Sequence, residues 1–209
     1  MPHWKEILKE RIEQSRIETI PKLGDGGSYQ FVHFPEEGWM EPDYMHAKVD
    51  GLMEMLRDWM HDADAIILIE AKGFLDTPLP FVANKPVGVI RKKDYPGIQD
   101  KVVVEQTTAY KSTITRMCGS RIKRGLKYII FDDVISSGGT AIATVHALEA
   151  YGCKVIGIAS TYERDDGANN IRKETGHDVR ALVRVDMKDG GACVERFYDE
   201  TVVRNVILE

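Results

Sequence analysis

The sequence YIIFDDVISSGGTAIATVHALEA, residues 128–150, carries the strongest structural signal in the chain. It begins as a short run of β-branched and aromatic residues, which is typical of a buried strand. Two adjacent acids follow, Asp132 and Asp133, and then a Ser-Ser-Gly-Gly-Thr turn at 136–140. The spacing after the turn predicts a helix over 140–151. A strand that passes through a glycine turn into a helix is half of a βαβ unit, the unit from which parallel sheets are built.

Short apolar runs recur on both sides of this stretch, and several are β-branched and too short for helices. A further helical pattern covers 168–175 and stops before Gly176. Strands alternating with helices predict an α/β fold: a mostly parallel twisted sheet flanked by helices. The other predicted strands are 65–70, 86–90, 101–106, 154–160 and 179–185.

The N-terminal region has a different pattern. Apolar residues at helical spacing predict an amphipathic helix over 3–20, which Pro21 ends. Residues 29–42 are rich in aromatics, Pro and Gly and indicate a short strand and an irregular excursion, a hood over the rest; helical spacing returns at 43–61. We expect one domain, with a helix and hood region at 1–60, an α/β core at 61–190 and a C-terminal extension at 191–209.

Composition limits the function. A net charge of −5 over 209 residues argues against a general nucleic-acid or membrane-surface binder. Since the N-terminus has no secretory pattern and no apolar run reaches bilayer length, the expected location is the cytosol. Three cysteines without a C-x-x-C pair, and six histidines without a ligand pattern, indicate neither a disulfide framework nor a metal site.

The two acids and the glycine turn predict a binding site. Ligands bind at the carboxyl ends of parallel strands, where Asp132 and Asp133 should lie. The N–H groups of a glycine turn that opens a helix suit a phosphate monoester, and paired carboxylates suit a sugar diol or a metal-bound sugar phosphate. The turn fits neither a P-loop nor a dinucleotide motif. An ordinary strand-to-helix connection, with Thr140 or a nearby Ser as N-cap, is the alternative.

Residues 128–140 resemble the binding motif for 5-phosphoribosyl-1-pyrophosphate (PRPP) in the type I phosphoribosyltransferases. The resemblance implies that Asp132 and Asp133 are catalytic acids that hold the ribose hydroxyls. It further implies a cradle for the 5-phosphate, made by Ser136, Ser137, Gly138, Gly139 and Thr140.

Two further stretches are similar to the adenine-type subgroup of that family. ILIEAKGF (67–74) resembles its pyrophosphate turn, and VIRKKDYPG (89–97) its basic stretch after the next strand. Lys72 as an exposed lysine in a turn is the alternative. The resemblance implies pyrophosphate contacts, partly across a dimer interface for the basic stretch, from Glu70, Ala71, Lys72, Gly73, Arg91, Lys92 and Lys93.

The family's mobile catalytic loop would lie within 94–115 and include Tyr110 as a catalytic residue. The adenine enzymes have Glu-Tyr-Gly here, whereas Ala109 and Lys111 flank this tyrosine, and Glu105 is a candidate for the missing acid. The archaeal hypoxanthine/guanine phosphoribosyltransferases look closer. Similar stretches are FVHF (31–34), RKKDYPG (91–97), DDVISSGGT (132–140), YERDDG (162–167) and TGHDVRALVRVD (175–186).

The resemblance implies an enzyme of purine salvage that transfers the phosphoribosyl group of PRPP to a purine, hypoxanthine or guanine being favoured. It also implies a homodimer and Mg²⁺ held mainly through PRPP and pyrophosphate, without a protein metal cluster. The alternatives are an adenine phosphoribosyltransferase, a non-catalytic regulator that senses PRPP or purine, and a receiver-like domain whose paired acids bind Mg²⁺.

Overall fold

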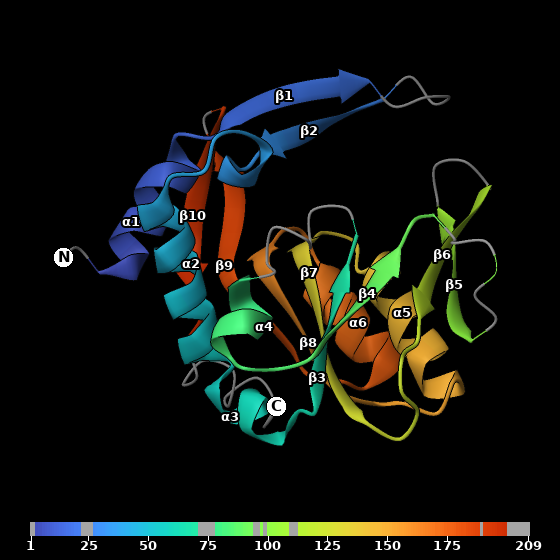
Figure 1. Cartoon of the computed structure of the whole chain (residues 1–209). Coiled ribbons are helices and arrows are strands. Elements are labelled where there is room, and N and C mark those ends of the chain that lie inside the picture. Colours follow the sequence, from blue (N-terminus) through green and yellow to red (C-terminus); the bar gives the residue numbers. More distant parts are fainter. Residues whose placement is uncertain are drawn as a thin grey trace.

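In the computed structural model, the described residues are 3–21, 27–70, 78–93, 97, 100–108, 113–188 and 190–199. Within these ranges a mixed sheet forms the centre of the molecule (Figure 1). Its strands are β3 (Ala65–Ile69), β4 (Val87–Arg91), β5 (Lys101–Thr108), β6 (Thr113–Ser120), β7 (Lys127–Ile135), β8 (Lys154–Glu163), β9 (Val179–Lys188) and β10 (Gly191–Phe197). The order is β10-β9-β8-β7-β3-β4-β6-β5.

The inner part of this sheet is parallel. Strands β9, β8, β7, β3 and β4 run in one direction, whereas β10 at one edge and β6 and β5 at the other pair antiparallel. All five residues of β3 are buried, and its side chains alternate between two cores: Ile66 and Leu68 join one, Ile67 and Ile69 the other. A strand buried on both faces needs apolar residues at every position, which explains its continuous apolar sequence.

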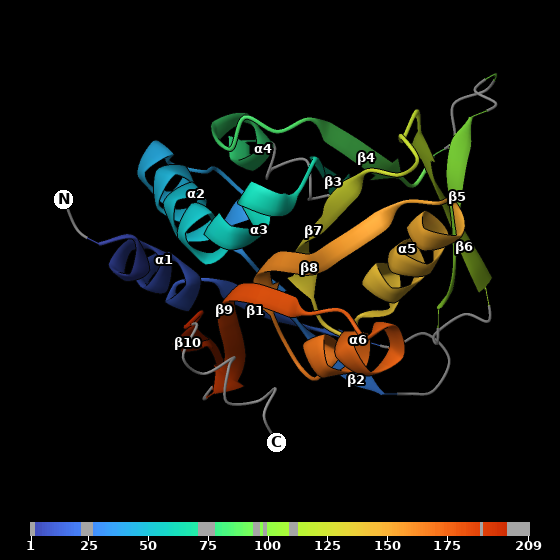
Figure 2. The ribbon, with the colours of Figure 1, turned by 90° about the horizontal axis from the view of Figure 1, so that it is seen from below.

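Helices cover both faces of the sheet. Figure 2 shows α5 (Gly139–Ala150) and α6 (Gly167–Thr175) on one side, and α2 (Pro42–Met55), α3 (Arg57–Asp62) and α4 (Pro78–Val82) on the other. The prediction of a mostly parallel α/β sheet flanked by helices is therefore confirmed. None of the helices in the described ranges combines the length and the apolar character needed to cross a bilayer.

The N-terminal hood consists of α1 (Trp4–Glu13), the antiparallel strands β1 (Arg16–Pro21) and β2 (Ser28–His33), and a 3-10 helix (Pro35–Glu37). Figure 1 shows β1 and β2 above the carboxyl ends of β3 and β7. The expectation of one helix over 3–20 is thus wrong after Glu13. The β-branched residues Ile17, Thr19 and Ile20 favour a strand, and pairing with β2 from Arg16 to Pro21 satisfies its backbone.

Other elements also differ from the predictions. The helix predicted over 43–61 is divided at Leu56 into α2 and α3. Strand β6 begins at Thr113, inside the stretch assigned to the catalytic loop, and forms a hairpin with β5. Strand β10, assigned to a C-terminal extension, is the edge of the central sheet and pairs with β9. Strand β10 is an edge strand with one neighbour, whereas β6 pairs with β5 along its length and with β4 only at Cys118 and Gly119. Neither strand needs the continuous apolar run of a strand buried between two full neighbours.

Candidate active site at the carboxyl end of the sheet

The two acids lie within strand β7. The strand continues to Ile135, which pairs with Glu163 of β8. Asp132 and Asp133 therefore lie inside the last part of the strand and do not follow its end, as the sequence suggested. Both are half-buried, and the Asp133 N–H donates to the Asp132 Oδ1 at 3.0 Å. The acids are therefore held on a rigid strand beside the loop that leads into α5.

This loop, residues 136–140, has the geometry of an anion site. Gly138 has a φ of 84°, in the left-handed region that favours glycine, and α5 begins at the next residue. The Ile142 N–H donates to the Gly138 carbonyl at 3.0 Å and closes the first helical turn, so the N–H groups before it point out of the helix end. No side chain caps Gly138 within the described structure, which leaves this end to a ligand or solvent.

Three residues of the α6 region hold the loop in place, although sequence analysis gave none of them a role. The Ser136 hydroxyl donates to the Asp165 Oδ2 at 2.6 Å, and the Asn170 Nδ2 donates to the Ser137 carbonyl at 3.3 Å. Gly167 packs so closely that a Cβ there would lie 2.2 Å from the Ser136 carbonyl oxygen. The only sequence signal was that Asp165 and Gly167 belong to the stretch YERDDG, which Asn170 follows three residues later.

A cavity of about 1120 Å³ lies between the hood and this end of the sheet. Of the predicted site residues, Asp133, Ser136 and Ser137 line it, so an acid and the start of the loop face one space. The hood supplies an apolar and aromatic wall. The remaining lining residues are Ile20, Pro21, Tyr29, Gln30, Phe31, Val32, Phe34, Val134, Arg164, Asp165, Asp166, Asn170 and Met187.

The second predicted group lies on the neighbouring strands. Leu68 of β3 is opposite Phe131 of β7, so Glu70 and Asp133 each follow two residues later on parallel strands. The Lys92 N–H donates to the Glu70 Oε2 at 2.6 Å, which places the stretch Arg91–Lys93 at the same edge of the sheet. Lys92 and Lys93 are exposed and Arg91 is half-buried.

Several predicted residues cannot be placed. Ala71, Lys72, Gly73 and Tyr110 lie outside the described residues. Glu105, the candidate loop acid, is in strand β5, opposite Arg116, with 3.5 Å between its Oε1 and the Arg116 Nε. The structure thus puts Glu105 on a hairpin at the sheet edge.

A buried polar cluster connects the hood to the sheet. The Glu36 Oε1 accepts hydrogen bonds from the hydroxyls of Tyr44 at 2.8 Å and Tyr162 at 2.9 Å, and from the Lys48 Nζ at 3.2 Å. The two hydroxyls also contact each other. Burial raises the pKa of the Tyr162 phenol well above its ordinary value, and the Glu36 carboxylate raises it further, so this hydroxyl stays protonated and donates.

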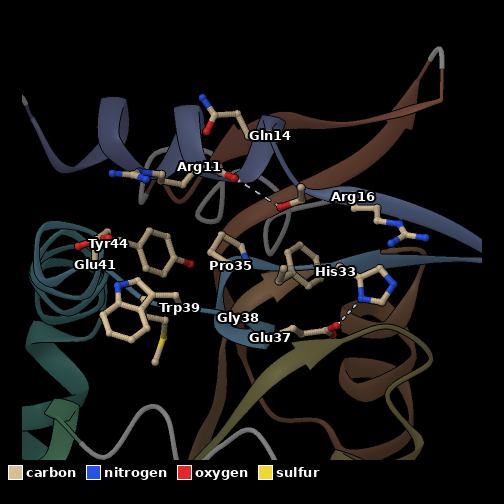
Figure 3. A pocket seen from close by; sticks show the side chains of 13 residues that line it. Arg11, Gln14, Arg16, His33, Pro35, Glu37, Gly38, Trp39, Glu41 and Tyr44 are labelled. Carbon is tan, nitrogen blue, oxygen red and sulfur yellow. Dashed lines mark hydrogen bonds and ion pairs between the residues drawn. The ribbon is translucent and has the colours of Figure 1, made fainter.

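A smaller cavity of about 420 Å³ lies on the outer side of the hood, near the start of α2 (Figure 3). Arg11, Arg16 and Glu41 lie around it, and Phe34 lines both this cavity and the larger one. In the same view, His33 points toward Glu37, and 2.6 Å separates its Nδ1 from the Glu37 Oε2. Phe34 and the 3-10 helix after it therefore form the partition between the two spaces.

The described residues contain no group of three or more His, Cys, Asp or Glu side chains placed to hold a metal ion. Asp132 and Asp133 are partly exposed carboxylates, the hard oxygen donors that Mg²⁺ prefers. Because Mg²⁺ commonly takes one or two carboxylates together with substrate phosphate oxygens and water, the residues present fit a substrate-bound Mg²⁺ ion.

The family model and the most similar relatives that the comparison with known proteins found are all phosphoribosyltransferases. The model of the family described as "Phosphoribosyl transferase domain" matches residues 65–188. A hypoxanthine/guanine phosphoribosyltransferase of Ferroglobus placidus is 34% identical, over 90% of this chain and 98% of the relative. The enzyme of the same name from Methanobacterium lacus is 32% identical, over 91% and 98%.

Solved structures share the fold at lower identity. An adenine phosphoribosyltransferase from Rhodothermus marinus is 23% identical, with a TM-score of 0.67 over 87% of this chain and 98% of that chain. The enzyme from Trypanosoma brucei, in complex with AMP, pyrophosphate and ribose-5-phosphate, is 16% identical, with a TM-score of 0.68 over 97% and 91%. At these identities the likeness establishes the fold alone.

The family match runs from β3 to the end of β9 and includes the acids, the glycine loop and the cavity wall behind them. The resemblance to the archaeal hypoxanthine/guanine enzymes, drawn from short stretches, is confirmed by alignments over nine-tenths of the chain. The chain belongs to the phosphoribosyl transferase family.

Proposed function

We propose that the protein is a purine phosphoribosyltransferase, which transfers the 5-phosphoribosyl group of PRPP to hypoxanthine or guanine and releases pyrophosphate. The observation that carries the proposal is the shared cavity, into which Asp133 and the start of the glycine loop both face. The names of the archaeal relatives support the choice of base.

The glycine loop has the task of holding the 5-phosphate. The outward N–H groups at the start of α5 and the hydroxyls of Ser137 and Thr140 are donors for its oxygens, with the backbones of Gly138 and Gly139 close beside it. Ser136 takes part through its backbone, because its hydroxyl donates to Asp165. Each charge-assisted hydrogen bond is worth about 1.5–3 kcal/mol, whereas the helix dipole adds about 0.3–1 kcal/mol. The donors of the loop therefore contribute more than the dipole of α5.

Asp132 and Asp133 accept hydrogen bonds from the ribose hydroxyls and bring negative charge close to the ribose ring. In the reaction a purine nitrogen forms a bond to C1 while the bond between C1 and the pyrophosphate oxygen breaks, and the base loses one proton to water or to the pyrophosphate. Positive charge develops on the ribose ring, as in other glycosyl transfers. Fixed carboxylates on strand β7 favour that charge without reorganisation. When bound, Mg²⁺ supplies positive charge to the pyrophosphate oxygens.

The pyrophosphate faces the basic stretch Arg91–Lys93 in this proposal. Glu70 would repel an anion, so its carboxylate serves to hold the Lys92 backbone through the hydrogen bond at 2.6 Å. Ala71, Lys72, Gly73 and Tyr110 stay in the proposal on the family resemblance. A homodimer is part of it for the same reason, and sedimentation of the purified protein tests it.

The base lies against the hood. Tyr29 and Phe31 give that wall of the cavity rings on which a planar heteroaromatic base can stack, and the buried Phe34 ring, stacked on Tyr162, lines the same wall. Hypoxanthine, guanine and adenine share this planar shape, so stacking selects purines as a class, and the polar edge of the pocket must choose among them.

The deciding experiment measures Mg²⁺-dependent pyrophosphate release from PRPP, with hypoxanthine, guanine, xanthine, adenine and orotate supplied separately. Turnover with hypoxanthine or guanine is expected. Turnover with adenine alone would make the protein an adenine phosphoribosyltransferase. Tight PRPP binding without turnover on any base would overturn the enzymatic proposal in favour of a PRPP-sensing regulator.

A further inference from the structure

The cluster of Glu36, Tyr44, Lys48 and Tyr162 is notable for its burial. The side chains of Lys48 and Glu36 are 0% and 3% exposed, so an ion pair is almost fully removed from water. The Tyr162 hydroxyl donates to both Glu36 oxygens at 2.9 Å, and Tyr44 and Lys48 donate to the same carboxylate. The cluster is therefore well satisfied internally.

Stability alone does not account for such a cluster. Removing a carboxylate and an ammonium from water costs several kcal/mol for each ion, and apolar side chains of similar volume often serve as well or better. The cluster also fixes geometry, because a carboxylate that accepts from three side chains allows few relative positions of the segments that carry them.

Those segments are the ones that bound the large cavity. Glu36 lies two residues after Phe34, which lines the cavity from the hood side. The Phe34 ring stacks on the Tyr162 ring, with 3.9 Å between centroids and 8° between planes. Tyr162 is opposite Val134, another lining residue, in the pairing of β8 with β7. The cluster thus joins the two walls between which a ligand lies.

A second contact also joins the end of β8 to the hood. Arg164, two residues after Tyr162, lines the cavity and donates from its Nη2 to the Gln30 carbonyl of β2 at 3.4 Å. The end of β8 is therefore connected to the hood at a buried point and at an exposed one. The buried point has the shorter contacts and the greater number of donors.

We infer that Glu36, Tyr44, Lys48 and Tyr162 are positioning residues that set the distance between the hood and the sheet, and so hold the cavity wall that contains Phe34 against the purine base. They act through Phe34 and do not touch the substrate. This inference rests on the proposed function. It predicts that changes in the cluster alter the affinity for the base and leave the affinity for PRPP unchanged.

The main test is the paired substitution Glu36→Leu with Lys48→Met, which replaces both charges by apolar side chains of similar volume. In this variant one tyrosine hydroxyl donates to the other. The melting temperature should stay the same or rise. The KM for the base should rise about three- to tenfold, the factor that one displaced aromatic contact is worth, while kcat and the KM for PRPP change less than about twofold.

Tyr162→Phe is the second variant. It keeps the ring that stacks on Phe34 and removes only the hydroxyl, so we expect a smaller rise in the KM for the base and again little change in the KM for PRPP. Asp58→Asn is the matched control. It weakens the pair between Asp58 of α3 and Arg180, at 2.5 and 2.8 Å, and should lower the melting temperature without a change in either KM.

The possible results distinguish a failure of this inference from a failure of the proposed function. A lowered melting temperature with an unchanged KM for the base would show that the cluster is structural only and would overturn the inference. Absence of turnover in the wild type would contradict the proposed function instead. In that case the dissociation constant of the base is compared between wild type and the paired variant in the presence of PRPP, and an equal value would overturn the inference.

Discussion

At the scale of single residues, the acid pair is the most consequential feature. Asp133 lines the cavity, whereas Asp132 accepts a hydrogen bond from the Asp133 backbone. Asp133→Asn should lower the turnover of PRPP by more than about tenfold, because one charge-assisted contact is weakened while the shape is kept. Turnover and the melting temperature are measured together, and wild-type turnover in a folded variant would refute the ribose role of Asp133.

This part of the site could be predicted because its residues are close together in the sequence. Asp132, Asp133 and the loop at 136–140 are contiguous, and their chemistry can be read from one stretch. Gly167 and Asn170 could not be assigned, because their contacts to the loop join residues about thirty positions apart. No local pattern encodes such a contact, since it follows from the packing of α6 beside the loop.

At the scale of elements, the phosphate loop depends on the close approach of α6. Gly167→Ala would place a Cβ 2.2 Å from the Ser136 carbonyl oxygen, a backbone atom that can yield only if the loop shifts. We expect a rise of about tenfold or more in the KM for PRPP. Gly38→Ala is the control, because a Cβ at that position meets nothing within 4 Å. Equal KM values for both variants would mean that the loop adapts without loss.

The hood hairpin should respond to pH through His33. Its Nε2 lies 3.0 Å from Glu18 of β1 and its Nδ1 lies 2.6 Å from Glu37, and hydrogen bonds to Glu18 and then Glu37 raise its pKa above the ordinary 6.5. Arg16 is opposite it on β1 and Phe31 packs edge-on against its ring. A raised pKa in the folded state stabilises the fold below the unfolded pKa, and this contribution is lost as pH rises through the folded value.

The free energy of unfolding of the wild type should therefore decrease relative to His33→Gln as pH rises above about 6.5, the ordinary histidine pKa. Denaturant titrations of both proteins at several pH values measure the difference. A difference that does not change with pH would contradict the role of His33 in the hairpin.

The strands β1 and β6 were not predicted from the sequence, because their own residues carry no strong strand pattern. The segment at 16–21 continues the charge spacing of α1, and its β-branched residues become a strand through their pairing with β2. The stretch at 113–120 mixes polar residues with Cys118 and Gly119 and is organised by β5. Inner strands such as β3 and β7 were predictable because burial on both faces requires a continuous apolar run.

At the scale of the whole molecule, the two ends of the described chain pack together. Helix α1 contacts α2 and β10, and the Trp4 ring meets Phe197 edge-on at 5.5 Å. We propose that the hood, the α/β core and β10 unfold as one cooperative domain. Tryptophan fluorescence, which reports on Trp4, the exposed Trp39 and the buried Trp59, and far-ultraviolet circular dichroism should give the same midpoint in urea. Two separate midpoints would mean that the hood unfolds on its own.

The position of β10 in the sequence also affects when the hood can fold during synthesis of the chain. The hood hairpin and α1 leave the ribosome first, but the strand against which α1 packs is complete only at Phe197. A domain that needs this strand cannot finish folding before the strand has been made, because the chain is made from its N-terminus. The hood residues are therefore made early, but the hood should take its final place over the acids and the glycine loop only once β10 has been made.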